Sequence, residues 1–322
     1  LDKIPSLLPQ QYQLWQWISD YYMSPLGDVY NAAMPAGMKS TEKFKPKMEL
    51  YVELSINYRN EQALHVALNM MQRALKQSKV FTTFLALSHW DSLEGDTPRE
   101  GIKRVTKEEL MNESHCTAAI VNALIDRGIL FTYEQEVGRL NTAGESHFDL
   151  IKPLSMAQQD AYNQILMQML QKNVVLLHGV TSSGKTEIYI HLIKKAMEEH
   201  KQVLYLLPEI ALTVQIMERL HKVFGDRLGI YHSKYSDAER VEIWQKQLSG
   251  HPYDVILGAR SAVFLPFQKL GLVIIDEEHE TSFKQQDPAP RYHARSAAIV
   301  LANMYPECKV LLGTATPSME SY

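Results

Sequence analysis

The stretch that decides the fold is Gly179-Val180-Thr181-Ser182-Ser183-Gly184-Lys185-Thr186, which follows the apolar run Val174-Val175-Leu176-Leu177. The segment after Thr186 has the apolar spacing of an amphipathic helix. A strand, a glycine-containing loop and a helix in this order are the setting of a phosphate-binding loop, or P-loop. Its glycines let backbone N–H groups point at phosphate oxygens, and the N-terminal end of the helix adds a positive dipole. The sequence therefore predicts a nucleotide site.

Each residue of this loop has an expected role. Lys185 is expected to reach the β- and γ-phosphates, and the Thr186 hydroxyl to ligate Mg²⁺. The remaining loop residues are expected to cradle the phosphates: Gly179, Val180, Thr181, Ser182, Ser183 and Gly184. The alternative, an ordinary glycine-rich turn, is disfavoured by the flanking strand and helix.

The composition is that of a globular chain with more than one domain, since 45% of its 322 residues are hydrophobic and 22% are charged. No apolar run approaches the roughly 20 residues of a membrane span, so no membrane partner is predicted. Two cysteines are too few for a disulfide framework or a closed zinc site, which predicts a reducing, cytoplasmic location. With a net charge of −4, any DNA contact must use local basic patches.

From residue 151 onward, short apolar runs alternate with helical stretches. The runs lie at 174–177, 203–207, 228–231, 255–257, 272–275 and 310–312. Such runs between helices predict an α/β fold, a parallel sheet with helices on both faces. Ligands of these sheets bind beyond the carboxyl ends of the strands, where the P-loop lies.

A pair of acids ends one of these runs, in Leu272-Val273-Ile274-Ile275-Asp276-Glu277-Glu278-His279. A nucleotide hydrolase needs one carboxylate for Mg²⁺ and one to orient the attacking water. Asp276 at the strand tip suits the metal, and Glu277 suits the water. An unrelated acidic strand end is the alternative, which the P-loop makes improbable.

The sequence of the N-terminal half predicts two small domains or domain fragments joined by a basic linker. Residues 1–38 include an aromatic-rich helix whose face joins Leu14, Trp17, Ile18 and Tyr21, and core packing is favoured over base stacking. Residues 39–50 carry several lysines and are expected to form a solvated charged linker, with a linker that touches phosphates as the alternative.

The sequence pattern of residues 51–150 predicts three helices. One lies within 61–76, one starts at 106 and one spans 114–126, and strand-like segments follow at 129–134 and 147–150. This is a winged-helix pattern. Its third helix carries few cations, so a structural or protein-contact role competes with DNA binding.

Four further motifs follow or precede the predicted strands. They occupy 154–158, 207–213, 258–264 (GARSAVF) and 313–318. In order and spacing this set resembles the first RecA-like lobe of superfamily 2 helicases. Within it, DEEH at 276–279, GARSAVF and the run at 283–295 resemble the PriA family of primosomal replication-restart helicases (primosomal protein N′). Residues 17–27 resemble the end of that family's N-terminal DNA-binding domain, whose earlier part is absent.

The resemblance implies roles for individual residues. Gln158 would read the adenine. The coupling of nucleotide state to DNA would involve His279, Gly313, Thr314, Ala315 and Thr316. The DNA-binding residues would be Glu209, Thr213, Arg260, Phe283, Lys284, Arg291, Tyr292 and His293. In the loop at 283–293, the aromatic rings offer stacking faces and the cations offer phosphate contacts. The alternative is a rigid surface loop pinned by Pro288 and Pro290.

The resemblance also implies an ATP- and Mg²⁺-dependent 3′-to-5′ DNA helicase that recognises forked DNA and starts primosome assembly. Its partners would be forked and single-stranded DNA, single-stranded-DNA-binding protein and other primosome proteins. Zinc is expected only beyond residue 322. Without a second lobe, residues 1–322 are expected to hydrolyse ATP poorly. Two alternatives remain: a DNA-structure-binding module without motor activity, and another superfamily 2 repair translocase. The predicted parts are 1–38, 39–50, 51–150 and 151–322.

Overall fold

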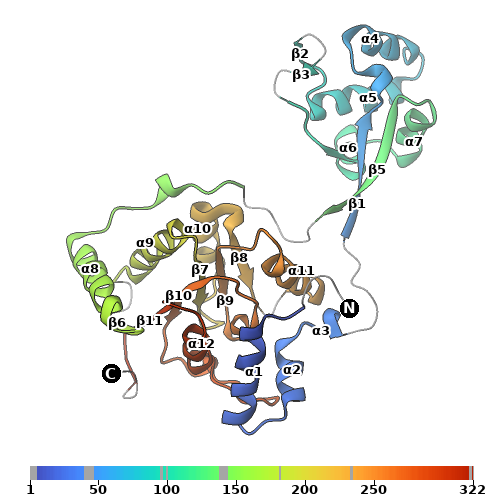
Figure 1. The fold of residues 1–322 in the computed structure, drawn as a ribbon. Helices are drawn as coiled ribbons and strands as arrows, with labels where there is room; N and C mark the ends of the chain where they lie inside the picture. The colour runs from blue at the N-terminus through green and yellow to red at the C-terminus, as the bar shows by residue number, and fades with distance from the viewer. Residues whose placement is uncertain are drawn as a thin grey trace. The chain divides into compact units, whose positions relative to one another are not determined.

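The computed structural model describes residues 6–39, 47–94, 97–98, 101–137, 144–180, 183–232, 235–318 and 321. The chain divides into two compact units (Figure 1). The sheet unit comprises Leu1–Phe44 and Arg139–Tyr322, and the winged-helix unit comprises Lys45–Gly138. None of the helices among the described residues has both the length and the apolar character that crossing a membrane requires.

Six parallel strands form the centre of the sheet unit, in the order β6-β11-β10-β7-β9-β8. Their bounds are β6 Val174–His178, β7 Gln202–Leu206, β8 Leu228–Tyr231, β9 Val255–Gly258, β10 Leu270–Asp276 and β11 Lys309–Thr314. Every apolar run identified in the sequence is one of these strands. The predicted parallel sheet is therefore confirmed.

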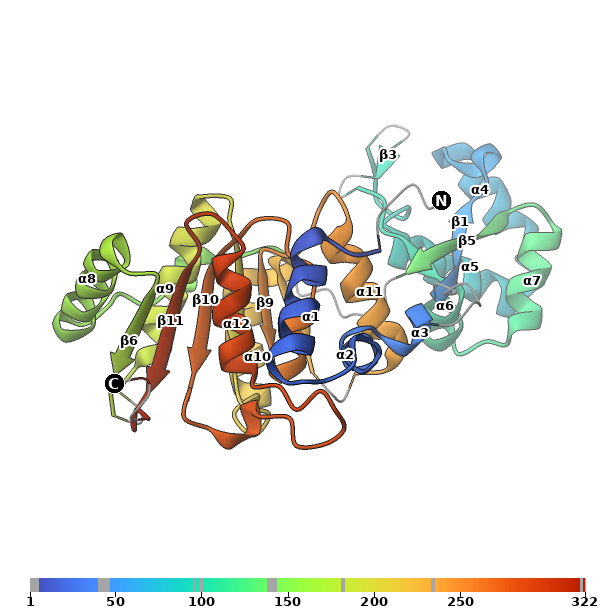
Figure 2. The same cartoon turned by 60° about the horizontal axis from the view of Figure 1, so that its bottom comes forward.

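Helices cover both faces of this sheet (Figure 2). One face carries α8 (Met156–Gln171), α9 (Lys185–Glu198) and α10 (Val214–Phe224), and the other carries α11 (Asp237–Leu248) and α12 (Ala294–Asn303). Successive side chains of a strand point to opposite faces. Thus Val203 and Tyr205 of β7 join the core under α9, while Leu204 and Leu206 join the core under α12. Short 3-10 helices lie at Phe148–Leu150, Gly225–Arg227, Arg260–Phe264 and Thr281–Phe283.

The N-terminal helices are part of the sheet unit. They are α1 (Pro9–Tyr21), α2 (Leu26–Ala33) and α3 (Ala36–Lys39), and α1 lies beside α12 (Figure 2). Leu14 and Ile18 of α1 are fully buried in the core under α12, which confirms the core interpretation for both. Tyr21, expected on the same apolar face, is 64% exposed, and its ring stacks on that of Trp17 at 5.0 Å between centroids.

The packing of α1 predicts a stability effect. Ile18→Ala should lower the free energy of unfolding of the sheet unit by about 2–4 kcal/mol, because it leaves a cavity in a closed core. Gln16→Ala, on the exposed side of α1, is the control and should change it by less than about 0.5 kcal/mol. Denaturant titrations followed by tryptophan fluorescence in a Trp90→Phe background, which removes the signal of the winged-helix unit, would measure both. Equal effects of the two variants would contradict this packing.

A small antiparallel sheet of order β4-β1-β5 anchors the winged-helix unit. Its strands are β1 Lys47–Leu54, β4 Val105–Thr106 and β5 Leu130–Val137, with a separate pair β2 Leu93–Glu94 and β3 Thr97–Pro98. The helices are the 3-10 turn Ile56–Tyr58, α4 Glu61–Met70, α5 Leu75–Ser88, α6 Lys107–Ser114 and α7 Ala118–Asp126. Thr106 is the N-cap of α6, and its side chain accepts a hydrogen bond from Glu109 N at 3.0 Å.

The single helix expected within 61–76 is wrong, since α4 ends at Met70 and α5 begins at Leu75. Met71 is fully buried at the turn, whereas Leu75, the first residue of α5, is 79% exposed. The turn lets α5 bury its own apolar face, including Phe81 and Phe84, in the core of this unit. Tertiary burial therefore interrupts a pattern that is helical throughout.

The predicted strand at 147–150 is also wrong. This segment forms the 3-10 helix Phe148–Leu150 in the sheet unit, where Phe148 packs edge-on against Phe224 and His147 N donates to Val223 O at 2.9 Å. The partner of β5 is instead β1, with Leu54 opposite Leu130. Because β1 starts at Lys47, the last residues of the expected linker are strand residues.

Candidate nucleotide-binding site

The predicted motifs meet at one edge of the large sheet. The P-loop follows β6, residues 207–213 follow β7, GARSAVF begins at the end of β9, and DEEH and residues 313–318 begin at the ends of β10 and β11. Because all six strands are parallel, their carboxyl ends share an edge. Residues that are distant in sequence are thereby brought together.

Lys185 occupies the first position of α9 and is largely buried. Its Nζ donates to Gly179 O at 2.9 Å and to Val180 O at 3.4 Å, so the lysine spans the loop. Gly184, the N-cap of α9, has a φ of +80°, a conformation that favours glycine. Thr186 is half-buried at the next helical position and Ser183 is exposed. The predicted loop residues Thr181 and Ser182 lie outside the described residues.

Gln158 lies against the P-loop. Its Oε1 accepts from Ser155 N at 2.9 Å at the start of α8, and its Nε2 donates to Gly184 O at 3.2 Å. A Cβ at position 184 would come within 2.3 Å of Gln158 Nε2. The 154–158 motif is therefore held at the nucleotide loop, while its contact with adenine stays a prediction.

The two acids also lie beside the P-loop. Glu277 has a φ of +48°, which is uncommon for a residue other than glycine, and its Oε1 lies 3.7 Å from Lys185 Nζ. Asp276 is 9% exposed, and this burial raises the pKa of its carboxyl group above the usual value. A buried carboxylate of this kind gains from a cation, and oxygen ligands suit Mg²⁺. The residues present thus fit the predicted metal.

Two tyrosines that the sequence reasoning missed contact Asp276. Tyr189 Oη of α9 donates to Asp276 Oδ1 at 2.9 Å, and Tyr205 Oη of β7 donates to Oδ2 at 3.5 Å. Both tyrosines are fully buried, and burial raises the pKa of each phenol well above its usual value. Each lies on the buried face of its helix or strand, so the sequence pattern does not distinguish it from a core tyrosine that has no polar partner.

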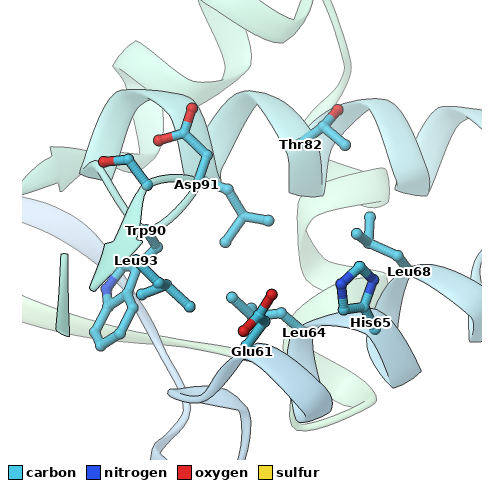
Figure 3. Close-up of a pocket in the computed structure, with 10 residues that line it drawn as sticks. Glu61, Leu64, His65, Leu68, Thr82, Trp90, Asp91 and Leu93 are labelled. Atoms are coloured by element: carbon cyan, nitrogen blue, oxygen red, sulfur yellow. The ribbon is translucent and has the colours of Figure 1, made fainter. Parts of the chain in front are cut away.

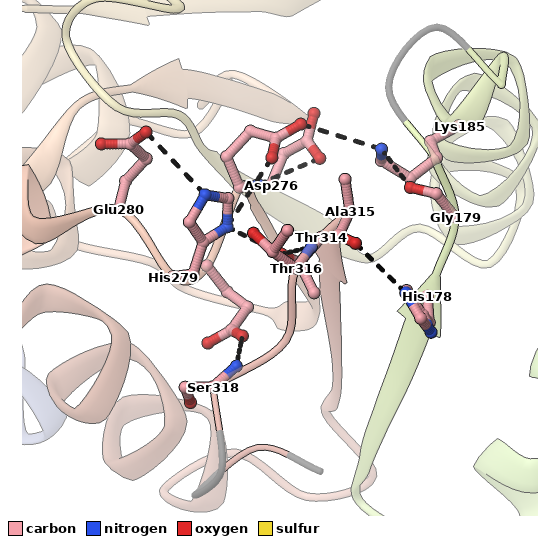
Figure 4. A network of polar contacts seen from close by, with 12 residues as sticks. His178, Gly179, Lys185, Asp276, His279, Glu280, Thr314, Ala315, Thr316 and Ser318 are labelled. Atoms are coloured by element: carbon pink, nitrogen blue, oxygen red, sulfur yellow. Dashed lines mark hydrogen bonds and ion pairs between the residues drawn. The ribbon is translucent and has the colours of Figure 1, made fainter.

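The residues expected to couple nucleotide to DNA form a connected network (Figure 4). His279 Nδ1 and Thr314 Oγ1 are hydrogen-bonded at 2.7 Å, and Thr316 N donates to the same hydroxyl oxygen at 3.1 Å. His279 also lies 3.8 Å from Glu277 Oε2. The histidine therefore connects the predicted water-orienting carboxylate to the segment at 313–316.

The end of β11 also contacts the P-loop strand. Gly179 N donates to Thr314 O at 3.0 Å, and His178 Nε2 lies 3.1 Å from Ala315 O (Figure 4). Glu278 N donates to Gly313 O at 3.1 Å on the other side. The 313–316 segment is therefore bonded to the P-loop strand and to DEEH at once.

Glu278 forms a buried ion pair that the sequence reasoning did not single out. Its Oε2 accepts from Arg295 Nη1 at 2.5 Å and from Ser321 Oγ at 2.8 Å, and its Oε1 accepts from Ser318 N at 3.4 Å. Burial opposes ionisation, but these donors hold the pKa of Glu278 below its usual value. The ion pair fixes the chain after 313–316 against α12.

Glu278→Gln should lower the free energy of unfolding of the sheet unit by about 2–3 kcal/mol at neutral pH, because Arg295 loses a buried carboxylate partner. A carboxyl group whose pKa is lower in the folded state stabilises the fold fully at pH values above its unfolded-state pKa, which is about 4.3 for glutamate. This stabilisation is lost as the pH falls through the folded-state pKa. The difference from wild type should therefore be constant from pH 8 to 6 and shrink below about pH 4.

Denaturant titrations across this pH range would measure the difference. Glu307→Gln is the matched control, because the Glu307 side chain is 83% exposed and its replacement should have little effect at any pH. A Glu278→Gln effect that is unchanged at low pH would contradict the assigned ion pair.

The expectation that Phe283 and Tyr292 offer stacking faces is wrong for this structure. Their exposed fractions are 0% and 1%, and Tyr292 packs edge-on against Phe264 at 4.9 Å between ring centroids. The loop closes as a hairpin because Gln285 N donates to Tyr292 O at 2.9 Å and Gln285 Nε2 donates to Pro288 O and Pro290 O. This rigid closure is the alternative that the sequence left open.

The polar residues of the same loop differ in exposure. The Arg291 side chain is 68% exposed, while Lys284 Nζ donates to Arg291 O and lies 4.8 Å from the centre of the Tyr22 ring. His293 is half-buried, and its N–H donates to Tyr22 Oη at 3.1 Å. Arg260 Nη1 donates to Ser282 O and Lys284 O, each at 3.2 Å, and so supports the base of the loop.

The two predicted DNA contacts after β7 lie near the start of α10. Glu209 is exposed, and Thr213 is the N-cap of α10, accepting from Ile216 N at 3.5 Å. Both follow the carboxyl end of their strand, as the ligand-binding edge requires. Their contact with DNA stays a prediction.

Comparison with known proteins gives matches along most of the chain. Residues 155–322, more than half of it, match the DEAD/DEAH box helicase family. Residues 49–137 match the winged helix domain of PriA helicases from Bacteroidota, and residues 1–35 match the 3′ DNA-binding domain of the same type of protein. The chain belongs to the PriA family of DEAD/DEAH box helicases.

Curated members of the PriA family align with almost all of the chain. Replication restart protein PriA of Chlamydia trachomatis is 34% identical over 310 residues, which cover 95% of this chain and 38% of that protein. The Bacillus subtilis protein is 35% identical over 288 residues, which cover 88% of this chain and 34% of that protein. The Haemophilus influenzae protein is 33% identical over 332 residues, which cover 100% of this chain and 41% of that protein. The chain thus spans about two fifths of the length of the PriA proteins it matches.

Proposed function

We propose that the protein is an ATP-dependent DNA helicase of replication restart that moves 3′ to 5′ on DNA and recognises forked structures. The observation that carries the proposal is the meeting of Lys185 and Glu277 at 3.7 Å beside the buried Asp276, within a chain of the PriA family. A lysine for phosphates, a carboxylate for the metal and a second one for water are the parts that ATP hydrolysis requires.

The roles follow from the positions of the side chains. Lys185 and the loop N–H groups would bind the phosphates, and Gln158 the adenine. Asp276 and Thr186 would hold Mg²⁺, which when bound neutralises charge on the phosphates. Glu277, next to the metal carboxylate, would orient the attacking water.

The DNA side of the proposal rests on the network of His279 and Thr314 and on the loop at 283–293. Arg291 and Lys284 would contact DNA phosphates, and the hydrogen bond between His279 and Thr314 would report the nucleotide state to the segment after β11. The partners would be forked and single-stranded DNA, single-stranded-DNA-binding protein and primosome proteins, in the cytoplasm.

Two variants separate binding from hydrolysis. Lys185→Ala should abolish both ATP binding and DNA-stimulated ATP hydrolysis by the full-length protein, because the phosphates lose their main cation. Glu277→Gln should bind ATP with an affinity within about threefold of wild type, because Lys185 keeps its hydrogen bonds to the loop carbonyls. It should hydrolyse ATP at least about 100-fold more slowly, because the attacking water loses its carboxylate.

Phosphate release with forked DNA and equilibrium binding of a fluorescent ATP analogue would measure these effects. Wild-type turnover in Lys185→Ala would contradict the proposal. Forked-DNA binding without hydrolysis by the wild-type protein would favour the second candidate, a DNA-structure-binding module without motor activity.

Arg291→Ala should weaken DNA binding uniformly across sequences and reduce the slope of log affinity against log salt by about 0.7–0.9, because one phosphate contact is lost. Lys172→Ala is the matched control, since this exposed lysine precedes β6 and so lies at the opposite edge of the sheet. Fluorescence anisotropy at several salt concentrations would measure the slopes. Equal slopes for both variants would remove Arg291 from the DNA contact.

A further inference from the structure

Several features of the described residues invite a function. One is the open pocket of about 700 Å³ between α4, α5 and residues 90–93 of the winged-helix unit, lined by Leu64, Leu68 and Leu93 with Glu61, His65 and Asp91 (Figure 3). Its lining mixes apolar and polar side chains with no arrangement that selects a particular ligand, so we do not assign it a function. A stronger feature lies beside the candidate nucleotide site, where Tyr189 and Gly313 contact Asp276, the carboxylate predicted to bind the metal.

Tyr189 is placed by the P-loop helix itself. It follows Lys185 by one helical turn on α9, and its ring is fully buried, packing edge-on against Tyr205 at 5.6 Å between centroids. Its hydroxyl donates to Asp276 Oδ1 at 2.9 Å, and Glu277 N donates to the same oxygen at 3.1 Å. The carboxylate therefore has two donors on one oxygen, and these restrain its rotation.

Gly313 supplies the space that this hydroxyl occupies. A Cβ at position 313 would lie 1.8 Å from Tyr189 Oη and 3.0 Å from Asp276 Oδ1. Gly313 is paired with Asp276 in the register of β10 and β11. It does not have a positive φ among the backbone angles of this chain, so the requirement for glycine here is space rather than conformation.

We propose that Tyr189 is a positioning residue that orients the Asp276 carboxylate for the metal–nucleotide complex, and that Gly313 keeps this contact open. Because Gly313 begins the 313–316 segment, a shift of that segment would move the hydroxyl and with it the metal carboxylate. The contact is thus a direct physical connection between the predicted coupling segment and the metal. The inference rests on the proposed ATP site and adds to it a residue that acts through Asp276.

The test is the Mg²⁺ dependence of binding of a fluorescent ATP analogue to the full-length protein. Tyr189→Phe should raise the Mg²⁺ concentration for half-maximal binding about tenfold, because a hydrogen bond to a charged group is lost. At saturating Mg²⁺ the nucleotide affinity should stay within about twofold of wild type. Tyr162→Phe is the matched control, a partly buried tyrosine of α8 that packs against His191, and should change neither quantity.

The double variant tests the contact itself. Gly313→Ala should raise the Mg²⁺ requirement at least as much as Tyr189→Phe and also lower the melting temperature, because the methyl group meets the hydroxyl. In Gly313→Ala/Tyr189→Phe the closest clash, with the hydroxyl, is gone, and contacts at 3.0 Å with Asp276 Oδ1 and the ring Cζ remain. Part of the melting temperature should therefore return, and the rise in the Mg²⁺ requirement should be smaller than the sum of the two single effects. Such non-additivity is expected for residues that contact each other, whereas distant and independent residues give additive effects.

The outcomes separate this inference from the proposed function. An unchanged Mg²⁺ requirement in Tyr189→Phe would overturn the positioning role while the ATP site stands. Strictly additive effects of the two substitutions would overturn the contact between Gly313 and Tyr189. Absence of Mg²⁺-dependent nucleotide binding in the wild-type protein would overturn the proposed function and the inference with it.

Discussion

The buried carboxylate of Asp276 is the constraint on which the rest of the site depends. An ionised carboxylate that is 9% exposed is costly unless donors or a cation surround it. Here the donors come from α9, from β7 and from the adjacent backbone N–H of Glu277. The P-loop helix, the neighbouring strand and the turn after β10 must therefore keep fixed positions relative to one another. A metal at this point would complete an arrangement that the protein already holds.

The end of β11 depends on the same constraint. Its backbone is hydrogen-bonded to the P-loop at Gly179 and to DEEH at Glu278, and Gly313, the first residue of the predicted coupling segment, lies against the Tyr189 hydroxyl. The side chain of Glu278 then fixes the chain beyond β11 through Arg295. A segment tied to both nucleotide motifs in this way is mechanically suited to carry a change at the phosphates toward residues outside the site.

Helix α1 extends this connected body to the N-terminus. The segment that matches the 3′ DNA-binding domain buries Leu14 and Ile18 in the core of the sheet unit. At the other end of the helix, Tyr22 accepts a hydrogen bond from His293 N and lies under Lys284. The loop at 283–293, which is predicted to contact DNA, is thus held by a residue at the end of α1 that lies 271 positions before His293 in the sequence.

The sequence by itself determined the parallel sheet and its six strands, and it predicted that the P-loop and acidic motifs follow the ends of these strands. It could do so because apolar periodicity and short-range motif chemistry are local properties. It misjudged the helix at 61–76, the strand at 147–150 and the exposure of Phe283 and Tyr292, because each depends on burial against residues distant in sequence. Only the tertiary structure showed that Tyr189, Gly313 and Asp276 touch. A tyrosine on a buried helix face has the same local pattern whether its hydroxyl meets a carboxylate or not, so the contact is decided by packing.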